Sequence, residues 1–241
     1  GTHIARVLEL PDRAAAARER LGAVTVVDTL TALLEPAPDL VVEVAGHGAL
    51  STHGTAVLEA GIDLLAVSIG ALADAELMDR LLAAAKRSGA QLLLAPGAVG
   101  GIDALAAMRL RGLARVRYRG VKPPIAWRGT PAERLLDLAR LAQRTSFYQG
   151  NAREAALAYP QNANVAATIA LAGLGFEATE VELVADPEAP GNRHEIEAEG
   201  ATGRFRIVLD GRPSEANPKT SALAALSVAR VILNRSAAIS I

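Results

Sequence analysis

The chain has no cysteine among its 241 residues, and aromatic side chains make up only 3% of it. Without cysteine it can form no disulfide, present no thiolate nucleophile and offer no sulfur ligand to zinc or an iron–sulfur cluster. Disulfide scaffolds, cysteine-dependent enzymes and Cys-ligated metal sites are therefore excluded. The absence also suits a reducing compartment, and we expect a cytoplasmic protein.

An excess of charge of either sign is missing as well, since 25 basic side chains stand against 26 acidic ones. The molecule as a whole thus has no electrostatic footprint for phosphate backbones, and we expect no nucleic-acid partner. Long apolar runs are also lacking, because the most apolar stretch, residues 91–108, is interrupted by Pro96, three glycines and Asp103. We expect no membrane span and, from the first six residues, no signal peptide.

Histidine is scarce, and no pair of the four histidines has the i, i+4 spacing and acidic neighbours of a zinc site. We therefore expect no metal. His194 differs from the other three because it begins a predicted strand in the second half of the chain. A lone histidine is more often structural than catalytic, but a pKa near neutrality makes His194 a candidate for acid–base chemistry.

The first hundred residues alternate short β-branched runs with alanine- and leucine-rich helical stretches. The predicted strands are residues 4–8, 24–27, 39–45, 63–68 and 91–95, and the predicted helices are residues 12–21, 29–34, 51–60 and 74–88. Such an alternation is typical of βαβ units on a parallel sheet. The sequence therefore predicts an α/β, doubly wound (Rossmann-type) domain over residues 1–103.

The pattern changes after Gly101. We expect helices at residues 103–110, 131–142, 152–159 and 164–172, a strand at 116–120, a loop at Lys122-Pro-Pro, and three strands at 180–184, 194–198 and 204–209. These runs predict an α+β domain over residues 104–218, with an antiparallel sheet covered by helices on one face. A last helix, about 220–234, is apolar enough to need a partner, and we expect residues 219–241 to pack back on the first domain.

Ligands of doubly wound domains bind where loops leave the carboxyl ends of the strands. One such loop, Gly46-His-Gly-Ala-Leu-Ser51, nearly matches the glycine-rich dinucleotide fingerprint. Its third glycine is replaced by serine and its unit is not the first in the series, so we favour a tight turn lining the crevice over a pyrophosphate loop. The loops at residues 68–74 and 96–103 carry small residues, which suit either a close ligand or close helix packing.

Two asparagine-rich segments begin predicted helices, Gln161-Asn-Ala-Asn-Val165 and Asn217-Pro-Lys-Thr-Ser221. Asparagine, threonine and serine commonly cap helices. A helix N-terminus also attracts anions, so Lys219 and Thr220 could hold a carboxylate while the same segment caps its helix.

Several longer motifs follow one another through nearly the whole chain. They include Pro96-Gly-Ala-Val-Gly100, Lys122-Pro123, Gly129-Thr-Pro-Ala-Glu133, Asn162-Ala-Asn-Val-Ala-Ala-Thr168, Asn192 with His194, and Asn217-Pro-Lys-Thr-Ser-Ala-Leu223. In this order they resemble the NAD(P)-dependent L-aspartate dehydrogenases. The resemblance implies a two-domain, homodimeric oxidoreductase that converts L-aspartate to iminoaspartate. The imine is then hydrolysed to oxaloacetate and ammonium or feeds quinolinate and hence NAD biosynthesis.

The resemblance also assigns residues. The catalytic histidine of the family falls on His194, and its cofactor-contacting alanine and asparagine fall on Ala98 and Asn164. Substrate carboxylates would be held by Asn192, Lys219 and Thr220. The loops at the carboxyl ends of the strands add His47, Ser68 and Gly70 as cofactor contacts.

Two departures from the family concern the N-terminus and one charge. The family opens with a strand and a Gly-x-Gly-x-x-Gly loop, whereas residues 4–8 correspond to its second strand. We expect that first βα unit to precede the sequence given, because its loss would leave an unpaired sheet edge. Gln161 stands where relatives often carry lysine, and a neutral side chain at this position weakens an anion contact.

The choice between NAD and NADP depends on two residues near the end of the first predicted strand. Glu9 could bind the ribose hydroxyls and favour NAD, whereas Arg13 could accept the 2′-phosphate of NADP, and we lean slightly to NAD. Two other functions remain open. The chain could be another amino or hydroxy acid dehydrogenase, of a homoserine-dehydrogenase-like kind, or a non-catalytic nucleotide-binding relative.

Overall fold

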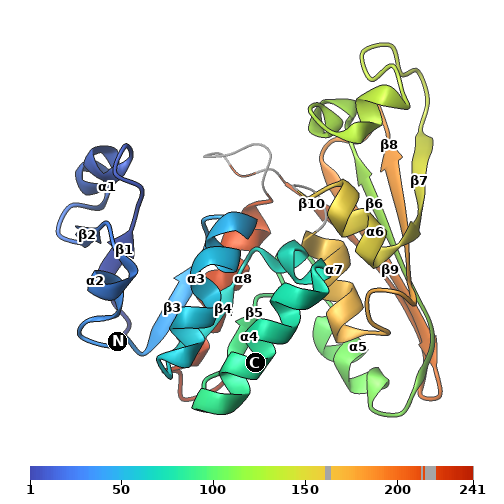
Figure 1. Ribbon diagram of the computed structural model, residues 1–241. Helices are drawn as coiled ribbons and strands as arrows, with labels where there is room; N and C mark the ends of the chain where they lie inside the picture. The colour runs from blue at the N-terminus through green and yellow to red at the C-terminus, as the bar shows by residue number, and fades with distance from the viewer. Residues whose placement is uncertain (161–163, 213, 215–220, 241) are drawn as a thin grey trace.

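The computed structural model describes residues 1–160, 164–212, 214 and 221–240 (Figure 1). Over these residues no helix is both long enough and apolar enough to span a bilayer. The elements of the first half are β1 (Arg6–Leu8), α1 (Ala14–Leu21), β2 (Thr25–Val27), α2 (Leu30–Leu34), β3 (Leu40–Glu43), α3 (His47–Glu59), β4 (Asp63–Ala66), the 3-10 helix η1 (Ile69–Ala73), α4 (Ala75–Ser88) and β5 (Leu92–Leu94).

The second half begins with a helix and ends with one. Its elements are α5 (Ile102–Arg109), β6 (Leu113–Lys122), the 3-10 helices η2 (Pro124–Trp127) and η3 (Pro131–Arg134), β7 (Thr145–Asn151), α6 (Ala152–Ala158), α7 (Asn164–Ala172), β8 (Thr179–Ala185), β9 (Asn192–Gly200), β10 (Gly203–Gly211) and α8 (Ala222–Asn234).

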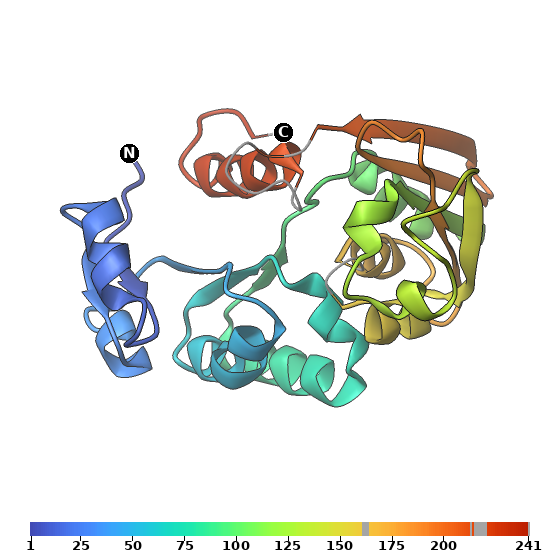
Figure 2. The same cartoon turned by 90° about the horizontal axis from the view of Figure 1, so that it is seen from above.

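The strands of the first half pair in parallel, so the prediction of βαβ units is confirmed. They form two sheets, β1-β2 and β3-β4-β5. Figure 2 shows the first sheet with α1 and α2 standing apart from the second. Helices α3 and α4 pack on one another and on the second sheet, where Leu50, Leu58 and Leu81 are completely buried.

Local signals explain where α4 begins and ends. The side chain of Asp74 accepts hydrogen bonds from the backbone N–H groups of Glu76 and Leu77, as a helix N-cap does. Gly89 follows the last turn with φ of +80°, a left-handed conformation that glycine adopts without strain. Between these ends the inward positions Leu77 and Leu81 recur at the helical spacing and are buried.

The second half is built on a five-stranded sheet of order β10-β9-β6-β8-β7. The predicted antiparallel pairing is confirmed for three of the four neighbouring pairs, but the sheet is mixed, because β6 and β8 pair in parallel. The reason is the strand β7, which the sequence reading missed. The chain reverses once between β6 and β7 and again between β7 and β8, so β8 runs in the direction of β6.

Two predictions for this half were wrong. The helix expected at residues 131–142 is only the short η3, because Thr130 caps it but the chain turns again at Asp137, whose carboxylate accepts from the N–H groups of Ala139 and Arg140. Lys122, expected in a loop, is the last residue of β6.

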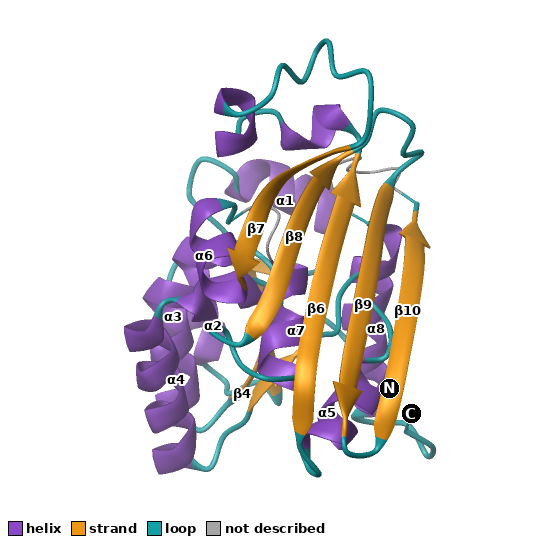
Figure 3. Ribbon diagram, turned by 90° about the vertical axis from the view of Figure 1, so that its right-hand side faces the viewer, coloured by secondary structure: helices purple, strands orange, loops and turns teal. Residues whose placement is uncertain are grey.

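The sheet has two contrasting faces. Along β6, Val116 and Tyr118 point inward and are buried beneath the helix layer, whereas Arg117 and Arg119 alternate with them on the outer face. Figure 3 shows that, in the described part of the chain, the helices lie behind the sheet or beyond its upper end. The outer face carries rows of opposite charge on neighbouring strands, and Arg119 bridges β8 and β9 through ion pairs with carboxylates on both.

Helix α8 returns from the second half to contact the first. The Ser227 hydroxyl accepts a hydrogen bond from the backbone N–H of Gly97, at 3.0 Å. Near the end of the helix, Arg235 forms an ion pair with Asp63 at 2.8 Å. These two contacts attach the C-terminal helix to the loop after β5 and to the start of β4.

Candidate active site

A buried carboxylate organises the loops after β3 and β4. Glu43, the last residue of β3, is 8% exposed and accepts four hydrogen bonds. The backbone N–H groups of Ala45 and Gly46 donate to its Oε1 at 2.8 Å, as does the Ser68 hydroxyl at 3.0 Å, and the Ser68 N–H donates to its Oε2 at 3.1 Å. Because donors from both loops meet at one side chain, Glu43 fixes the two loops relative to one another.

Three of the predicted cofactor residues meet beside these loops. The N–H of Gly70 donates to Oδ1 of Asn164 at 2.9 Å, which connects η1 in the first half to the first turn of α7 in the second. A Cβ atom on Gly70 would lie 2.9 Å from that oxygen and 3.0 Å from Nε2 of His47. Only glycine therefore allows the three residues this close approach.

The other predicted cofactor residues are more dispersed. Ala98 is buried and follows Gly97, which has φ of +72° and is bonded to α8 as described above. Glu9 lies just after β1, half-buried, with its carboxylate accepting from the N–H of Leu10. Arg13 is exposed and begins α1.

A second cluster surrounds His194 near the beginning of β9. In the antiparallel pairing of β6 with β9, His194 stands directly opposite Gly120, between Tyr118 and Lys122 on the same inward face. The Tyr118 hydroxyl lies 2.9 Å from Nδ1 of His194. It fits there because Gly120 has no side chain: a Cβ atom at that position would be 2.7 Å from the hydroxyl oxygen.

The hydrogen bond between Tyr118 and His194 determines which ring nitrogen carries the proton. If Nδ1 donated to the phenol, both the phenol proton and Nε2 would remain without partners among the described residues. If the phenol donates, only Nε2 lacks a partner, and Nε2 is a buried atom with none. Since each unsatisfied buried polar atom costs about 1–3 kcal/mol, the structure favours phenol donation and a proton on Nε2.

Burial also sets the protonation states in this cluster. His194 is 3% exposed, and burial, with the nearby charge of Lys122, lowers its pKa to about 3. Burial lowers the pKa of Lys122 to about 8 and raises the pKa of Tyr118. At neutral pH the histidine is therefore neutral, and the lysine can lose its proton at only mildly basic pH.

Trp127 supports Lys122 from the adjoining segment. Its ring lies 5.2 Å from Nζ of Lys122, within the range of a cation–π contact. The indole is completely buried and its N–H donates to the carbonyl of Val184 at 3.1 Å. The ring thus has a fixed position, and it limits where the lysine side chain can lie.

Several sequence predictions can now be placed. Asn192 is half-buried at the start of β9, two residues before His194 and on the same face. Lys219, Thr220 and Gln161 lie outside the described residues. The sequence reading missed Glu43, Tyr118 and Lys122 as site residues, although a single acid ending an apolar strand and the alternation Tyr118-x-Gly-x-Lys were visible signals.

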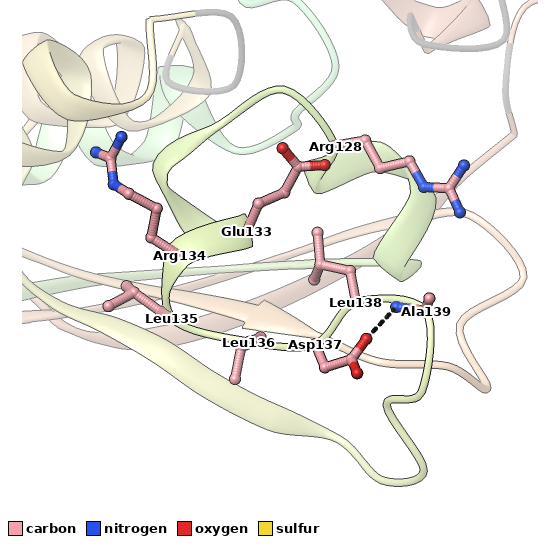
Figure 4. A pocket seen from close by; sticks show the side chains of 8 residues that line it. All are labelled: Arg128, Glu133, Arg134, Leu135, Leu136, Asp137, Leu138 and Ala139. Carbon is pink, nitrogen blue, oxygen red and sulfur yellow. Dashed lines mark hydrogen bonds between the residues drawn. The ribbon is translucent and has the colours of Figure 1, made fainter.

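An open pocket of the described residues lies elsewhere. It has a volume of about 510 Å³ and is formed by one continuous segment, residues 128–139, at the upper end of the sheet. Figure 4 shows Glu133, Arg134 and Arg128 around it, with Asp137 bonded to the backbone of Ala139. None of the predicted site residues lines it.

The donor set around the parallel strands suits a dinucleotide. Gly46 has φ of +109° and open space at its Cβ position, so a ligand can approach its backbone. Gly70, Asn164 and His47 offer amide and imidazole groups at the adjoining strand end, where nucleotides bind in this class of fold. By contrast, no group of three His, Asp or Glu side chains within the described ranges is arranged to hold a metal ion.

Family models match both halves of the chain. Residues 4–95 match the NAD binding domain described for homoserine dehydrogenase. Residues 103–235 match the C-terminal domain of aspartate dehydrogenase. The second match covers more than half of the chain.

Known proteins give the same result. L-aspartate dehydrogenase of Ralstonia nicotianae is 53% identical over 230 residues, covering 95% of this chain and 86% of the relative. The enzyme of that name from Ruegeria pomeroyi is 49% identical over 239 residues, covering 99% and 86%. The crystal structure of aspartate dehydrogenase from Thermotoga maritima superposes over 100% of both chains, with a TM-score of 0.77 and 25% identity. This chain therefore belongs to the L-aspartate dehydrogenase family.

Proposed function

We propose that this protein catalyses the NAD(P)-dependent oxidation of L-aspartate to iminoaspartate, which water converts to oxaloacetate and ammonium. The observation that carries the proposal is Nε2 of His194, a buried polar atom without a partner in the described part of the chain. Such an atom costs stability unless a ligand completes it. It therefore marks a place for a polar substrate.

The residues divide the chemistry between them. A bound nicotinamide would supply the acceptor for the hydride that leaves Cα of the substrate. His194 provides acid–base chemistry at Nε2, where its proton can be donated to a substrate oxygen or nitrogen. Tyr118 holds the imidazole through Nδ1, so that Nε2 keeps its direction.

Cofactor contacts are assigned to the residues at the strand ends. We assign these contacts to Ala98, His47, Ser68 and Gly70 in the first half and to Asn164 in the second. Glu9 at the end of β1 favours NAD through the ribose hydroxyls, and the exposed Arg13 remains available to a 2′-phosphate. We expect NAD to be preferred slightly.

The two carboxylates of aspartate need fixed donors. Asn192 is suited to one of them because it shares a face and a strand with His194. Lys219 and Thr220 are assigned to the same role through the family resemblance. This arrangement would select a dicarboxylic amino acid over a simple one.

The two halves are proposed to act as separate domains. Residues 1–103, with residues 219–241, would bind the cofactor, and residues 104–218 would bind the substrate. The hydrogen bond from Gly97 to Ser227 and the ion pair of Arg235 with Asp63 support the assignment of the C-terminal helix to the first domain.

We also propose a homodimer that associates through the outer face of the five-stranded sheet. Rows of arginine and glutamate alternate there, so the surface is complementary to itself under a two-fold axis. Val208, 47% exposed among these charges, offers an apolar point of contact. Sedimentation velocity should give twice the chain mass, and Val208→Arg should give a monomer; a monomeric wild-type protein would refute the proposal.

The product suggests a place in metabolism. Iminoaspartate that is not hydrolysed is a reactive precursor, and we assign its supply for NAD biosynthesis as a second fate beside deamination. Trapping the imine by a downstream enzyme should compete with oxaloacetate release.

The first test is oxidation of NADH, and separately of NADPH, with oxaloacetate and ammonium. Oxidation that requires ammonium supports the proposal, and the ratio of rates decides between Glu9 and Arg13. Turnover with a different amino or hydroxy acid would instead indicate another dehydrogenase. NADH binding without turnover on any of these substrates would favour a non-catalytic relative.

The role of His194 has its own test. His194→Ala should lower kcat by at least about 10²-fold, because a general acid–base contributes on that order, while NADH binding stays nearly unchanged. Turnover at the wild-type rate would remove His194 from the mechanism.

A further inference from the structure

We propose that Lys122 is the base of this reaction and that its neutral amine removes a proton from the substrate ammonium group. The inference rests on the function proposed above and deepens it by naming a second catalytic residue. His194 then has the complementary role, in which its Nε2–H donates a hydrogen bond to the substrate.

Lys122 lies on the same face of the sheet as His194. Lys122 is two residues from Gly120 on the inward face of β6, and Gly120 is the residue opposite His194. The lysine is 7% exposed, its charge acts on His194, and its Nζ lies over the fixed ring of Trp127. The lysine therefore shares the inward face of the sheet with the imidazole whose Nε2 marks the substrate position, and its charge acts on that ring.

The choice of lysine is informative in this chain. Only three of the 25 basic side chains are lysines, at positions 86, 122 and 219, and the remainder are arginines. An arginine stays charged under all conditions in proteins, whereas a buried lysine can give up its proton. Where the chain needs a permanent cation, as on the outer face of the sheet, it uses arginine.

His194 is poorly suited to accept the proton itself. Phenol donation from Tyr118 to Nδ1 leaves the proton on Nε2, so the atom directed at the substrate is already a donor. Burial and the charge of Lys122 further oppose a second proton on the ring. The base must then be another group, and Lys122 on the same face of the sheet has a pKa lowered by burial to about 8.

The proton and electron balance follows. The substrate ammonium R–NH₃⁺ gives one proton to the neutral amine of Lys122, forming R–NH₂ and a lysine ammonium. The Cα–H bond then breaks with its electron pair, which leaves as hydride to NAD(P)⁺, and the nitrogen lone pair forms the C=N bond. One iminium ion, one reduced cofactor and one proton on Lys122 result, and that proton passes to solvent before the next turnover.

The groups around Lys122 bear on the pH dependence. On the inward face they include His194 and Tyr118. Asp186, half-buried, donates its backbone N–H to the carbonyl of Lys122 at 2.9 Å, and Arg193 is paired with Asp210. Since burial is the main cause of the lowered pKa, deprotonation of Lys122 should appear as an acidic limb near pH 8 in kcat/KM for aspartate oxidation.

The kinetic test uses Lys122→Met and Lys122→Ala, with Lys86→Met on the exposed surface of α4 as the matched control. Lys122→Met should lose about 10²- to 10⁴-fold in kcat at pH 8, lack the limb near pH 8 and bind NADH as the wild type does. In Lys122→Ala a small primary amine should restore turnover in a saturable way. A raised KM with kcat and the limb unchanged would mean that Lys122 only binds a carboxylate, and would overturn the proposal.

A measurement without turnover completes the test. With only three lysines, protein labelled at the lysine side chains gives few NMR signals, and Lys122→Met and Lys86→Met assign two of them. The Lys122 signal should titrate near pH 8, and histidine ¹⁵N shifts should show the proton on Nε2; titration above pH 10, or a proton on Nδ1, would refute the assignment. If the wild type oxidises no aspartate, the proposed function fails as well. An active wild type with an unaffected Lys122→Met refutes the role of Lys122 alone.

Discussion

Glu43→Gln tests whether the Glu43 carboxylate holds the loops after β3 and β4 together. The substitution keeps the shape of the side chain and removes one hydrogen-bond acceptor. The amide oxygen can replace Oε1 and keep its three donors. The amide NH₂ then faces the N–H of Ser68, which donated to Oε2 at 3.1 Å. One charge-assisted bond is lost and two donors face one another at a site only 8% exposed.

The expected cost is about 2–3 kcal/mol, the usual value for a lost hydrogen bond to a buried charged group. Amide hydrogen exchange measures this loss of stability at individual backbone N–H groups. Since 1.4 kcal/mol is about a factor of ten, the N–H groups of Gly46 and Ser68 should exchange about 30- to 150-fold faster. NADH should also bind more weakly, because the loops that carry His47 and Gly70 lose their common anchor.

Glu59→Gln is the matched control. Glu59 forms an ion pair with Arg87 at 2.8 Å, but both side chains are more than half exposed. Such a pair contributes about 0–1 kcal/mol, so this variant should leave the exchange of Gly46 and Ser68 unchanged. If Glu43→Gln exchanges at these two amides no faster than Glu59→Gln does, the role given to Glu43 is refuted.

Three further predictions concern the second cluster and the C-terminal helix. Gly120→Ala should destabilise the protein by about 1–3 kcal/mol in urea, because the new methyl group would overlap the Tyr118 hydroxyl, and by less in a Tyr118→Phe background; equal costs in both would contradict the packing described. Ser227→Ala should cost about 1 kcal/mol by removing the acceptor of the Gly97 N–H, and unchanged exchange of that amide would count against it. The unfolding free energy should fall as the pH drops from about 6.5 toward 3, because in this range His194 binds a proton in the unfolded chain but not in the folded one. The unfolding free energy of His194→Gln should therefore depend less steeply on pH over that window.

Local patterns were sufficient to predict much of the fold. Short β-branched runs predicted all five strands of the first half, and helix-ending glycines such as Gly89 fixed helix ends to within a residue or two. The strand β7 was missed because Thr-Ser-Phe-Tyr-Gln-Gly-Asn has no clear alternation and is identified only by its pairing with β8. The parallel pairing of β6 with β8 depends on that strand, so it could not be predicted either.

The residues of the candidate site likewise fall into those that a local pattern marks and those that only tertiary pairing brings together. His194 was predicted because a family motif marks it, and the loops after β3 and β4 were predicted because they follow the ends of strands. Tyr118 and Lys122 were not found, since their role depends on the register that brings Gly120 opposite His194, seventy-four residues away in the sequence. Glu43 was missed because its function is to receive hydrogen bonds from two loops, and no local pattern encodes such partners.

The charged outer face of the sheet has a consequence for how β6 finds its alignment with β9. Arg115, Arg117 and Arg119 stand opposite three glutamates, and sliding β6 by two residues toward a neighbouring alignment would keep two of the three pairings. Since each cross-strand pair contributes only about 0.2–1 kcal/mol, the charges penalise such sliding weakly. The inner face distinguishes the alternatives, because only one alignment sets the side-chain-free Gly120 opposite His194, where Nδ1 of the imidazole lies 2.9 Å from the Tyr118 hydroxyl. The same glycine that leaves room for the Tyr118 hydroxyl thereby also lies at the position that identifies the correct pairing of the two strands.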